Sequence, residues 1–303
     1  MGRLFKALSI TCISIVLGAG LVMGYSACSQ LKEMGSESYR KKQEKGKVIT
    51  QRINKVSLEG MMADELEQKY EKIKINGETF DCESASIIKY HESKKSDKLI
   101  VYIQDIHKAS SFGDKTVVQE SLYNSIDEMN KENSIDMLVL EGTPQEDVTK
   151  EMIESNTSNF YKLFWYVFRG FWMPEGKEQS LTAFPAGVAY EYVNDTLIET
   201  RGAEDEDIHN TAWYVATTPT TSEGKVWLFE KLVSEKRSEI GVEKTLQYMA
   251  QSRKKKAVLV FGAAHTRKIV ECLEKEDVSY IVLQPKGVDT YINLIKLQTA
   301  MEQ

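Results

Sequence analysis

The sequence predicts an α/β fold in which a mostly parallel sheet is flanked by helices. Two observations support this prediction. Short runs rich in apolar residues recur along the chain, and segments long enough to form helices separate them. Strands that alternate with helices usually form a parallel sheet that is covered on both faces. The predicted strands are Leu99–Ile103, Met137–Leu140, Leu197–Thr200, Ala257–Phe261 and Tyr280–Leu283.

The segments around these strands are assigned in chain order. Residues 30–71 are polar and favour a helical stalk. In residues 72–90, isoleucines alternate with lysines before Asn76-Gly77, a dipeptide that favours a two-residue hairpin turn. We therefore expect a small β-hairpin there, at the start of an α/β domain over residues 72–303. Helices are predicted over 114–130, 224–251 and 265–274, and a helical, aromatic-rich insert is predicted at about 145–195.

The N-terminal residues 1–29 have the features of a membrane-targeting segment. Arg3 and Lys6 precede a stretch without charges that is long enough to span a bilayer. Tyr25-Ser26-Ala27-Cys28 resembles a bacterial lipobox, so we expect either a lipoprotein lipidated at Cys28 or an uncleaved signal anchor. Basic residues between 32 and 55 favour a cytoplasmic body, whereas a signal peptide favours export. We expect attachment to the bacterial cell envelope.

Composition excludes several classes of protein. The chain has 303 residues, of which 42% are hydrophobic and 28% are charged, as is typical of globular proteins. A net charge of −6 and the lack of a basic domain argue against a nucleic-acid partner. The four cysteines form no CxxC or Cys/His cluster, which argues against structural zinc. Composition predicts no oligomeric state.

Polar side chains follow four of the predicted strands. Ligands of open parallel sheets bind beyond the carboxyl ends of the strands, and those ends share one edge. We therefore expect these side chains to converge there. They are Asp105 and His107 after the first strand, Glu141 after the second, Glu204 and Asp205 after the third, and Gly262 and His265 after the fourth.

Such a group of residues can perform two kinds of chemistry. A histidine beside a carboxylate can accept a proton from water. Alternatively, His107, Glu141 and His265 could hold a divalent metal that activates water. Arg237 or Arg201 could stabilise a developing oxyanion. Each residue also has a purely structural alternative. Glu141 could cap a helix or pair with a lysine. Glu204, Asp205 and His209 could lie on the solvated surface.

Several motifs together resemble the TraB/Tiki, ChaN and erythromycin-esterase-like superfamily, in its uncharacterised bacterial branch. The resemblance covers about residues 98–286. Gln104 and Asp105 stand where the usual pattern of the group has Gly and Glu. The matching motifs are Ile103-Gln104-Asp105-Ile106-His107 with Gln119, Leu138-Val139-Leu140-Glu141-Gly142, Gly202-Ala203-Glu204-Asp205, Arg237, Gly262-Ala263-Ala264-His265 and Tyr280-Ile281-Val282-Leu283-Gln284-Pro285.

The resemblance implies three activities. Tiki-like members are membrane-associated, metal-dependent peptidases, and esterase-like members hydrolyse a lactone with His and Glu. ChaN-like members are lipoproteins that bind haem, for which Trp165 and Trp172 would form an apolar wall. We favour an envelope-associated hydrolase of a small molecule or peptide, with His107, Glu141, His265, Asp105 and Arg237 as catalytic candidates. The alternatives are a haem or apolar-ligand binding lipoprotein and an inactive scaffold.

Overall fold

A computed structural model of the chain describes residues 69–106, 115–142, 144, 146–149, 192–193, 196–217, 223–290 and 292–293, together with residues 52 and 296. The targeting segment 1–29, nearly all of the stalk and most of the aromatic insert lie outside these residues. Within the described ranges, no helix has the length and apolar character needed to cross a membrane.

The predicted hairpin at the start of the domain is confirmed. β1 (Lys72–Ile75) pairs antiparallel with β2 (Glu78–Asp81). Asn76 and Gly77 between them have φ angles of 52° and 81°, the left-handed values that a tight two-residue hairpin turn requires. The hairpin buries Ile73, Ile75 and Phe80 against the domain core, which explains the alternation of isoleucine and lysine.

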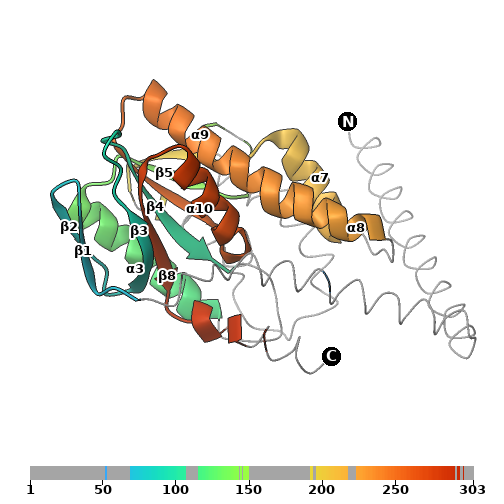
Figure 1. Cartoon of the computed structure of the whole chain (residues 1–303), viewed down its shortest axis with the longest axis horizontal. Helices are drawn as coiled ribbons and strands as arrows, with labels where there is room; N and C mark the ends of the chain where they lie inside the picture. The colour runs from blue at the N-terminus through green and yellow to red at the C-terminus, as the bar shows by residue number, and fades with distance from the viewer. Residues whose placement is uncertain are drawn as a thin grey trace, which may run out of the picture. The chain divides into compact units, whose positions relative to one another are not determined.

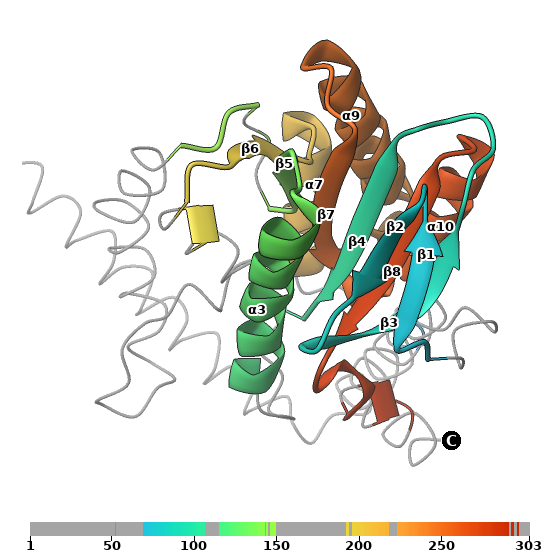
Figure 2. The same cartoon turned by 90° about the vertical axis from the view of Figure 1, so that its left-hand side faces the viewer.

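The main sheet has six strands in the order β3-β8-β4-β7-β5-β6 (Figures 1 and 2). All neighbouring strands are parallel except β3, which pairs antiparallel with β8 at one edge. The sheet is thus mixed but mostly parallel. Each strand predicted from an apolar run is present, but the strand predicted over Leu197–Thr200 begins two residues later, at Glu199. The strands are β3 (Ala85–His91), β4 (Leu99–Asp105), β5 (Met137–Leu140), β6 (Glu199–Gly202), β7 (Lys256–Gly262) and β8 (Ser279–Pro285).

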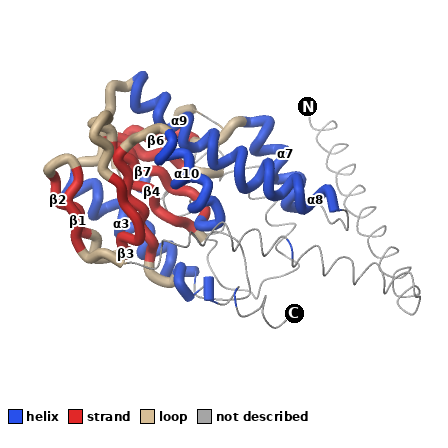
Figure 3. The backbone as a smooth tube through the Cα atoms, viewed as in Figure 1, coloured by secondary structure: helices blue, strands red, loops and turns tan. Residues whose placement is uncertain are grey.

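Helices cover both faces of this sheet (Figures 2 and 3). α3 (Lys115–Asn133) packs on one face together with the hairpin, around the core that includes Val101 and Leu122. α9 (Arg237–Gln251) and α10 (Thr266–Lys275) pack on the other face. Two covered faces explain why β4, β5 and β8 are buried along their whole length.

The helix predicted over 224–251 is divided into three parts. α8 (Glu223–Leu228) leads into a π-helix, η2 (Phe229–Lys236), and then into α9. The N–H of Arg237 donates to the carbonyl of Leu232, five residues back, at the end of the π-helix. π-helical segments are rare and are often found at functional sites.

Strand register determines which residues meet at the carboxyl edge of the sheet. Asp105 at the end of β4 pairs with Gly262 at the end of β7, and Leu140 of β5 pairs with Val260. The first residues after β5 therefore lie beside the last residues of β7. Glu141 is the first residue after β5, and its N–H donates to the Val260 carbonyl at 3.0 Å. This backbone bond places the Glu141 side chain beside the end of β7.

Candidate functional site

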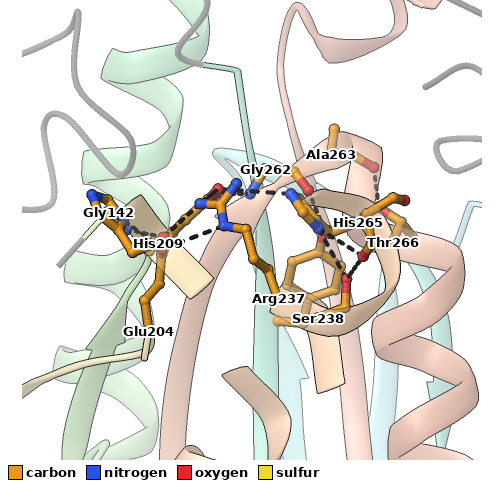
Figure 4. A network of polar contacts seen from close by, with 12 residues as sticks. Gly142, Glu204, His209, Arg237, Ser238, Gly262, Ala263, His265 and Thr266 are labelled. Carbon is orange, nitrogen blue, oxygen red and sulfur yellow. Dashed lines mark hydrogen bonds and ion pairs between the residues drawn. The ribbon is translucent and has the colours of Figure 1, made fainter. Parts of the chain in front are cut away.

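A buried ion-pair network occupies the carboxyl edge of the sheet (Figure 4). Its centre is Arg237, the first residue of α9. Arg237 Nη2 donates to Glu141 Oε1 at 2.6 Å and to Glu204 Oε1 at 2.5 Å, and Nε donates to Glu204 Oε2 at 3.2 Å. Glu141 and Glu204 are buried, and the side chain of Arg237 is only 11% exposed. One guanidinium thus joins two carboxylates from different strand ends.

Backbone donors complete the coordination of both carboxylates. Glu141 Oε2 accepts from the Gly262 N–H at 2.5 Å, and Glu204 Oε1 accepts from the Gly142 N–H at 2.7 Å. Gly142 has a φ of 89°, a left-handed conformation that side chains rarely adopt, so glycine is favoured there. The Gly262 N–H is already used by Glu141. Gly262 therefore helps to build the site and does not offer this donor to a ligand.

Burial and neighbouring charges shift the pKa values of Glu204 and Arg237 in opposite directions. Burial raises the pKa of Glu204, but the charge of Arg237 and the hydrogen bonds from His209 and Arg237 outweigh it and hold this pKa well below its usual range. Burial likewise lowers the pKa of Arg237, but the charges of Glu141 and Glu204 outweigh it and keep this pKa above its ordinary value. Glu204 and Arg237 are therefore both ionised at neutral pH.

His265 lies beside this network at the end of the short 3₁₀ turn η3 (Ala263–His265). Its Nε2 is 3.7 Å from Glu141 Oε1, too far for a hydrogen bond but close enough for strong electrostatic interaction. Its Nδ1 is 2.9 Å from Ser238 Oγ and 3.2 Å from the Ser234 carbonyl. Burial lowers the pKa of His265 to about 4, and the Arg237 charge adds to this shift against an opposing effect of Glu141. The imidazole is thus neutral at pH 7.

The turn that carries His265 is held from β4. Thr266 Oγ1 donates to the Ala263 carbonyl at 2.7 Å and accepts from Gln104 Nε2 at 2.8 Å. Tyr102 donates its hydroxyl proton to the Gly262 carbonyl at 3.1 Å, and its oxygen lies 3.0 Å from Thr266 Oγ1. These buried contacts fix the backbone on both sides of His265. Nothing in the sequence alone indicated this role for Tyr102, Gln104 and Thr266.

His209 also joins the network, contrary to the surface position expected for it. Its Nδ1 lies 2.6 Å from Glu204 Oε2, and its side chain is 24% exposed. The reason is α7 (Glu206–Thr217), a helix that begins within the acidic segment 204–207 and turns His209 back towards Glu204. The solvated-surface alternative for Glu204 is likewise wrong, because Glu204 is only 1% exposed.

The other described candidate residues lie outside the Arg237 network. Asp205 is exposed and caps α7, because its Oδ1 accepts from the N–H groups of Asp207 and Ile208 at 3.1 Å. Asp105 is buried and accepts from Gln119 Nε2 of α3 at 2.6 Å, on the face of the sheet opposite α9. Arg201 pairs with Glu199 and Asp147, not with the described network residues. His107, Trp165 and Trp172 lie outside the described residues.

The expected metal site can be tested only on its described members. Within the described ranges, no three His, Cys, Asp or Glu side chains are grouped so that they could hold a metal ion. Glu141 Oε1 accepts from the Arg237 guanidinium, so a cation on this oxygen would lie beside a fixed positive charge. Glu141 and His265, as the structure places them, therefore do not fit a divalent metal.

Comparison of the chain with protein-family models, with curated proteins and with solved structures finds no significant match. The fold and the network define the class of protein: an α/β protein with a buried Glu-Arg-Glu network and a neutral histidine at the carboxyl edge of a mostly parallel sheet.

Proposed function

We propose that this protein is a hydrolase of carbonyl compounds, such as esters, lactones or amides, with His265 as its general base. The observation that carries the proposal is the pairing of a buried, neutral imidazole with a fixed carboxylate. His265 Nε2 is 3.7 Å from Glu141 Oε1, and Glu141 is itself held by Arg237 and by the Gly262 N–H. A histidine with a carboxylate beside it is suited to removing a proton from water.

The Glu141 charge favours proton transfer to Nε2, whereas burial and the Arg237 charge oppose it. Burial keeps His265 neutral, so its base form is populated throughout the physiological pH range. When the ring accepts a proton, the imidazolium lies 3.7 Å from Glu141 Oε1. Opposite unit charges at such a separation attract by about 4 kcal/mol at an effective dielectric constant of 20, before the opposing charge of Arg237 is counted. Glu141 therefore stabilises the charge that the reaction creates.

Arg237 can provide the complementary stabilisation of the substrate. Its bonds to the two carboxylates use Nε and Nη2. Its remaining nitrogen, Nη1, bonds no residue in the described part of the chain. A donor fixed in place before the reaction is effective at stabilising the oxyanion that forms when water attacks a carbonyl carbon. We assign this role to Arg237 rather than to Arg201, which is paired with Glu199 and Asp147.

The proposal includes attachment to the bacterial cell envelope through residues 1–29 and relationship to the TraB/Tiki, ChaN and erythromycin-esterase-like superfamily. The support for attachment is the uncharged N-terminal stretch that ends in Ser26-Ala27-Cys28. The support for relationship is the set of motifs that includes Glu141-Gly142 and Gly262-Ala263-Ala264-His265. A small molecule or a peptide remains the proposed substrate class.

The test is turnover by the purified full chain against panels of esters, lactones and peptides. His265→Gln should abolish any turnover found, because glutamine cannot act as a base. His91→Gln is the matched control, because His91 is a partly exposed histidine whose nearest charged partner is Asp277 at 3.8 Å. It should leave turnover unchanged. Circular dichroism and melting temperature should show that both variants fold. Turnover that survives in a folded His265→Gln protein would exclude the proposed base.

A further inference from the structure

We infer that Ser238 is a positioning residue that holds His265 in the tautomer with its proton on Nδ1. The catalytic meaning of this inference rests on the proposed function, but the tautomer itself does not. Ser238 is fully buried on α9. Its Oγ is 2.9 Å from His265 Nδ1, and the Ser234 carbonyl is 3.2 Å from the same nitrogen. Ser238 Oγ also donates to that carbonyl.

The protons available to His265 Nδ1, Ser238 Oγ and the Ser234 carbonyl determine the tautomer of His265. A carbonyl oxygen can only accept hydrogen bonds, and the Ser238 hydroxyl has one proton to donate. Because Ser238 gives that proton to the Ser234 carbonyl, Ser238 Oγ can only accept from His265. Nδ1 must therefore carry a proton, which it shares between Ser238 Oγ and the Ser234 carbonyl. A neutral imidazole has one N–H, so Nε2 keeps its lone pair.

The opposite tautomer is disfavoured by the same contacts. With the proton on Nε2, Nδ1 would present a lone pair to the Ser234 carbonyl at 3.2 Å. The Ser238 hydroxyl has one proton, so it could then donate either to Nδ1 or to the Ser234 carbonyl, but not to both. At least one close contact would then join two acceptors with no proton between them, so this arrangement is less stable. The hydroxyl and the carbonyl together leave Nε2, the nitrogen nearer Glu141, as the basic atom.

Ser238 does not act as a nucleophile, although serine, histidine and glutamate occur together here. Two observations oppose that role. Ser238 is 0% exposed, so a substrate cannot touch its hydroxyl. Its hydroxyl is also committed to the Ser234 carbonyl and lies at Nδ1, whereas Glu141 lies at Nε2. Ser238 therefore acts through His265 and does not contact the reacting atoms.

The π-helix places these groups together. Ser234 lies in η2, and Arg237 and Ser238 follow three and four residues later at the start of α9. Arg237 and Ser238 are consecutive residues, so their side chains leave the helix in different directions. Arg237 reaches the two carboxylates and Ser238 reaches His265 (Figure 4). The first turn of α9 therefore positions both the proposed oxyanion donor and the proposed base.

The tautomer can be read directly from the ¹⁵N spectrum of histidine-labelled full-length protein. The chain has only four histidines. His91→Gln, His107→Gln and His209→Gln identify three of them, and the fourth is His265, so the buried residue need not be changed. Long-range ¹H–¹⁵N correlations at pH 7 should show a single neutral tautomer of His265 with the proton on Nδ1. A His265 signal with the proton on Nε2, or with both nitrogens protonated, would overturn the inference.

Two further variants separate positioning from stability. Ser238→Ala removes the closer acceptor, so the spectrum should gain the Nε2–H form, and kcat should fall about tenfold, as expected for the loss of one hydrogen bond. Thr245→Val is the matched control, because the buried Thr245 hydroxyl donates to the Gly241 carbonyl on α9 without contacting His265. It should leave the spectrum and kcat unchanged. A wild-type tautomer in folded Ser238→Ala would overturn the role of Ser238.

The spectrum also separates this inference from the proposed function. A protein with the Nδ1–H tautomer but without turnover of any substrate would support the positioning of His265 and contradict the hydrolase. Turnover that requires His265, in a protein whose His265 has the Nε2–H tautomer, would support the hydrolase and contradict the positioning of His265 by Ser238. Labelling of Ser238 by a serine-directed phosphonate would overturn its assignment as a positioning residue.

Discussion

At the scale of single residues, the site depends on the balance of charge around Arg237. Two carboxylates share this guanidinium, and all three groups are buried or nearly so. A buried ion pair adds little net stability, but removal of one partner leaves a buried charge without compensation. The carboxylates therefore depend on one another for their position, and a change in either affects both.

The first prediction concerns the loss of one carboxylate. Glu204→Gln should lower the free energy of unfolding by about 3 kcal/mol, because Arg237 and His209 lose their shared anionic partner. Urea denaturation followed by circular dichroism measures this change. Glu271→Gln is the control, because Glu271 pairs with Arg267 at the surface, where such pairs contribute little. Equal midpoints for the two variants would contradict the buried network.

The second prediction concerns pH. The folded pKa of His265 is about 4, below its ordinary value of 6.5, so the unfolded state binds more protons between these pH values. Folded stability should therefore be complete above pH 6.5, fall as the pH decreases from 6.5 to 4, and become independent of this group below 4. The loss due to His265 is about 3 kcal/mol.

The measurement for this pH effect is the denaturation midpoint of wild type and His265→Gln across that range. Glu204 acts at lower pH, because its depressed pKa gives stability that is lost only below the unfolded value of 4.5. The wild type and the variant should differ in how steeply the denaturation midpoint changes with pH, and this difference is the contribution of His265. Parallel curves would show that His265 protonates normally in the folded protein.

At the scale of elements, the contact between α9 and β7 sets the position of the site. Gly241 on α9 faces Phe261, and a Cβ at Gly241 would lie 3.0 Å from the Phe261 ring. That ring packs edge-on against His265, with centroids 4.8 Å apart, and the Arg237 guanidinium lies 5.7 Å from its centroid. A small residue at 241 therefore allows the helix to approach the strand closely.

The third prediction tests this approach. Gly241→Ala should destabilise the fold by about 1 kcal/mol, because overpacking costs about 1–3 kcal/mol and the better helix propensity of alanine recovers at most about 1 kcal/mol. The His265 resonances should also shift as Phe261 moves. Thermal denaturation and the ¹⁵N spectrum measure both effects. A stabilised protein with unchanged His265 signals would show that the helix is not packed as described.

Elements also show how far the sequence predicts the structure. The buried strands follow from runs such as Met137–Leu140, and the hairpin follows from Asn76-Gly77. α7 was missed because its acidic start looks like solvated surface, although Asp205 is a recognisable cap. The π-helix and the buried position of Ser238 depend on tertiary packing, which no local pattern encodes.

At the scale of the whole molecule, residues 1–29 are proposed to tether the described domain to a membrane. The fourth prediction is that full-length protein sediments with the membrane fraction and that a chain starting at residue 30 does not. Mass spectrometry of the membrane-bound form distinguishes the two alternatives, because lipidation at Cys28 requires cleavage before that residue. Full-length protein in the soluble fraction would contradict the tether.

The central claim is that Glu141 and His265 act as one catalytic unit, and a double-mutant cycle tests it most directly. Residues that act as a unit lose their effect together, so their losses do not multiply. We predict that His265→Gln and Glu141→Gln each lower kcat/KM at least about a hundredfold, and that the double variant is no worse than the more damaging single one. Losses that multiply in the double variant would show that the two residues act independently and would contradict the account.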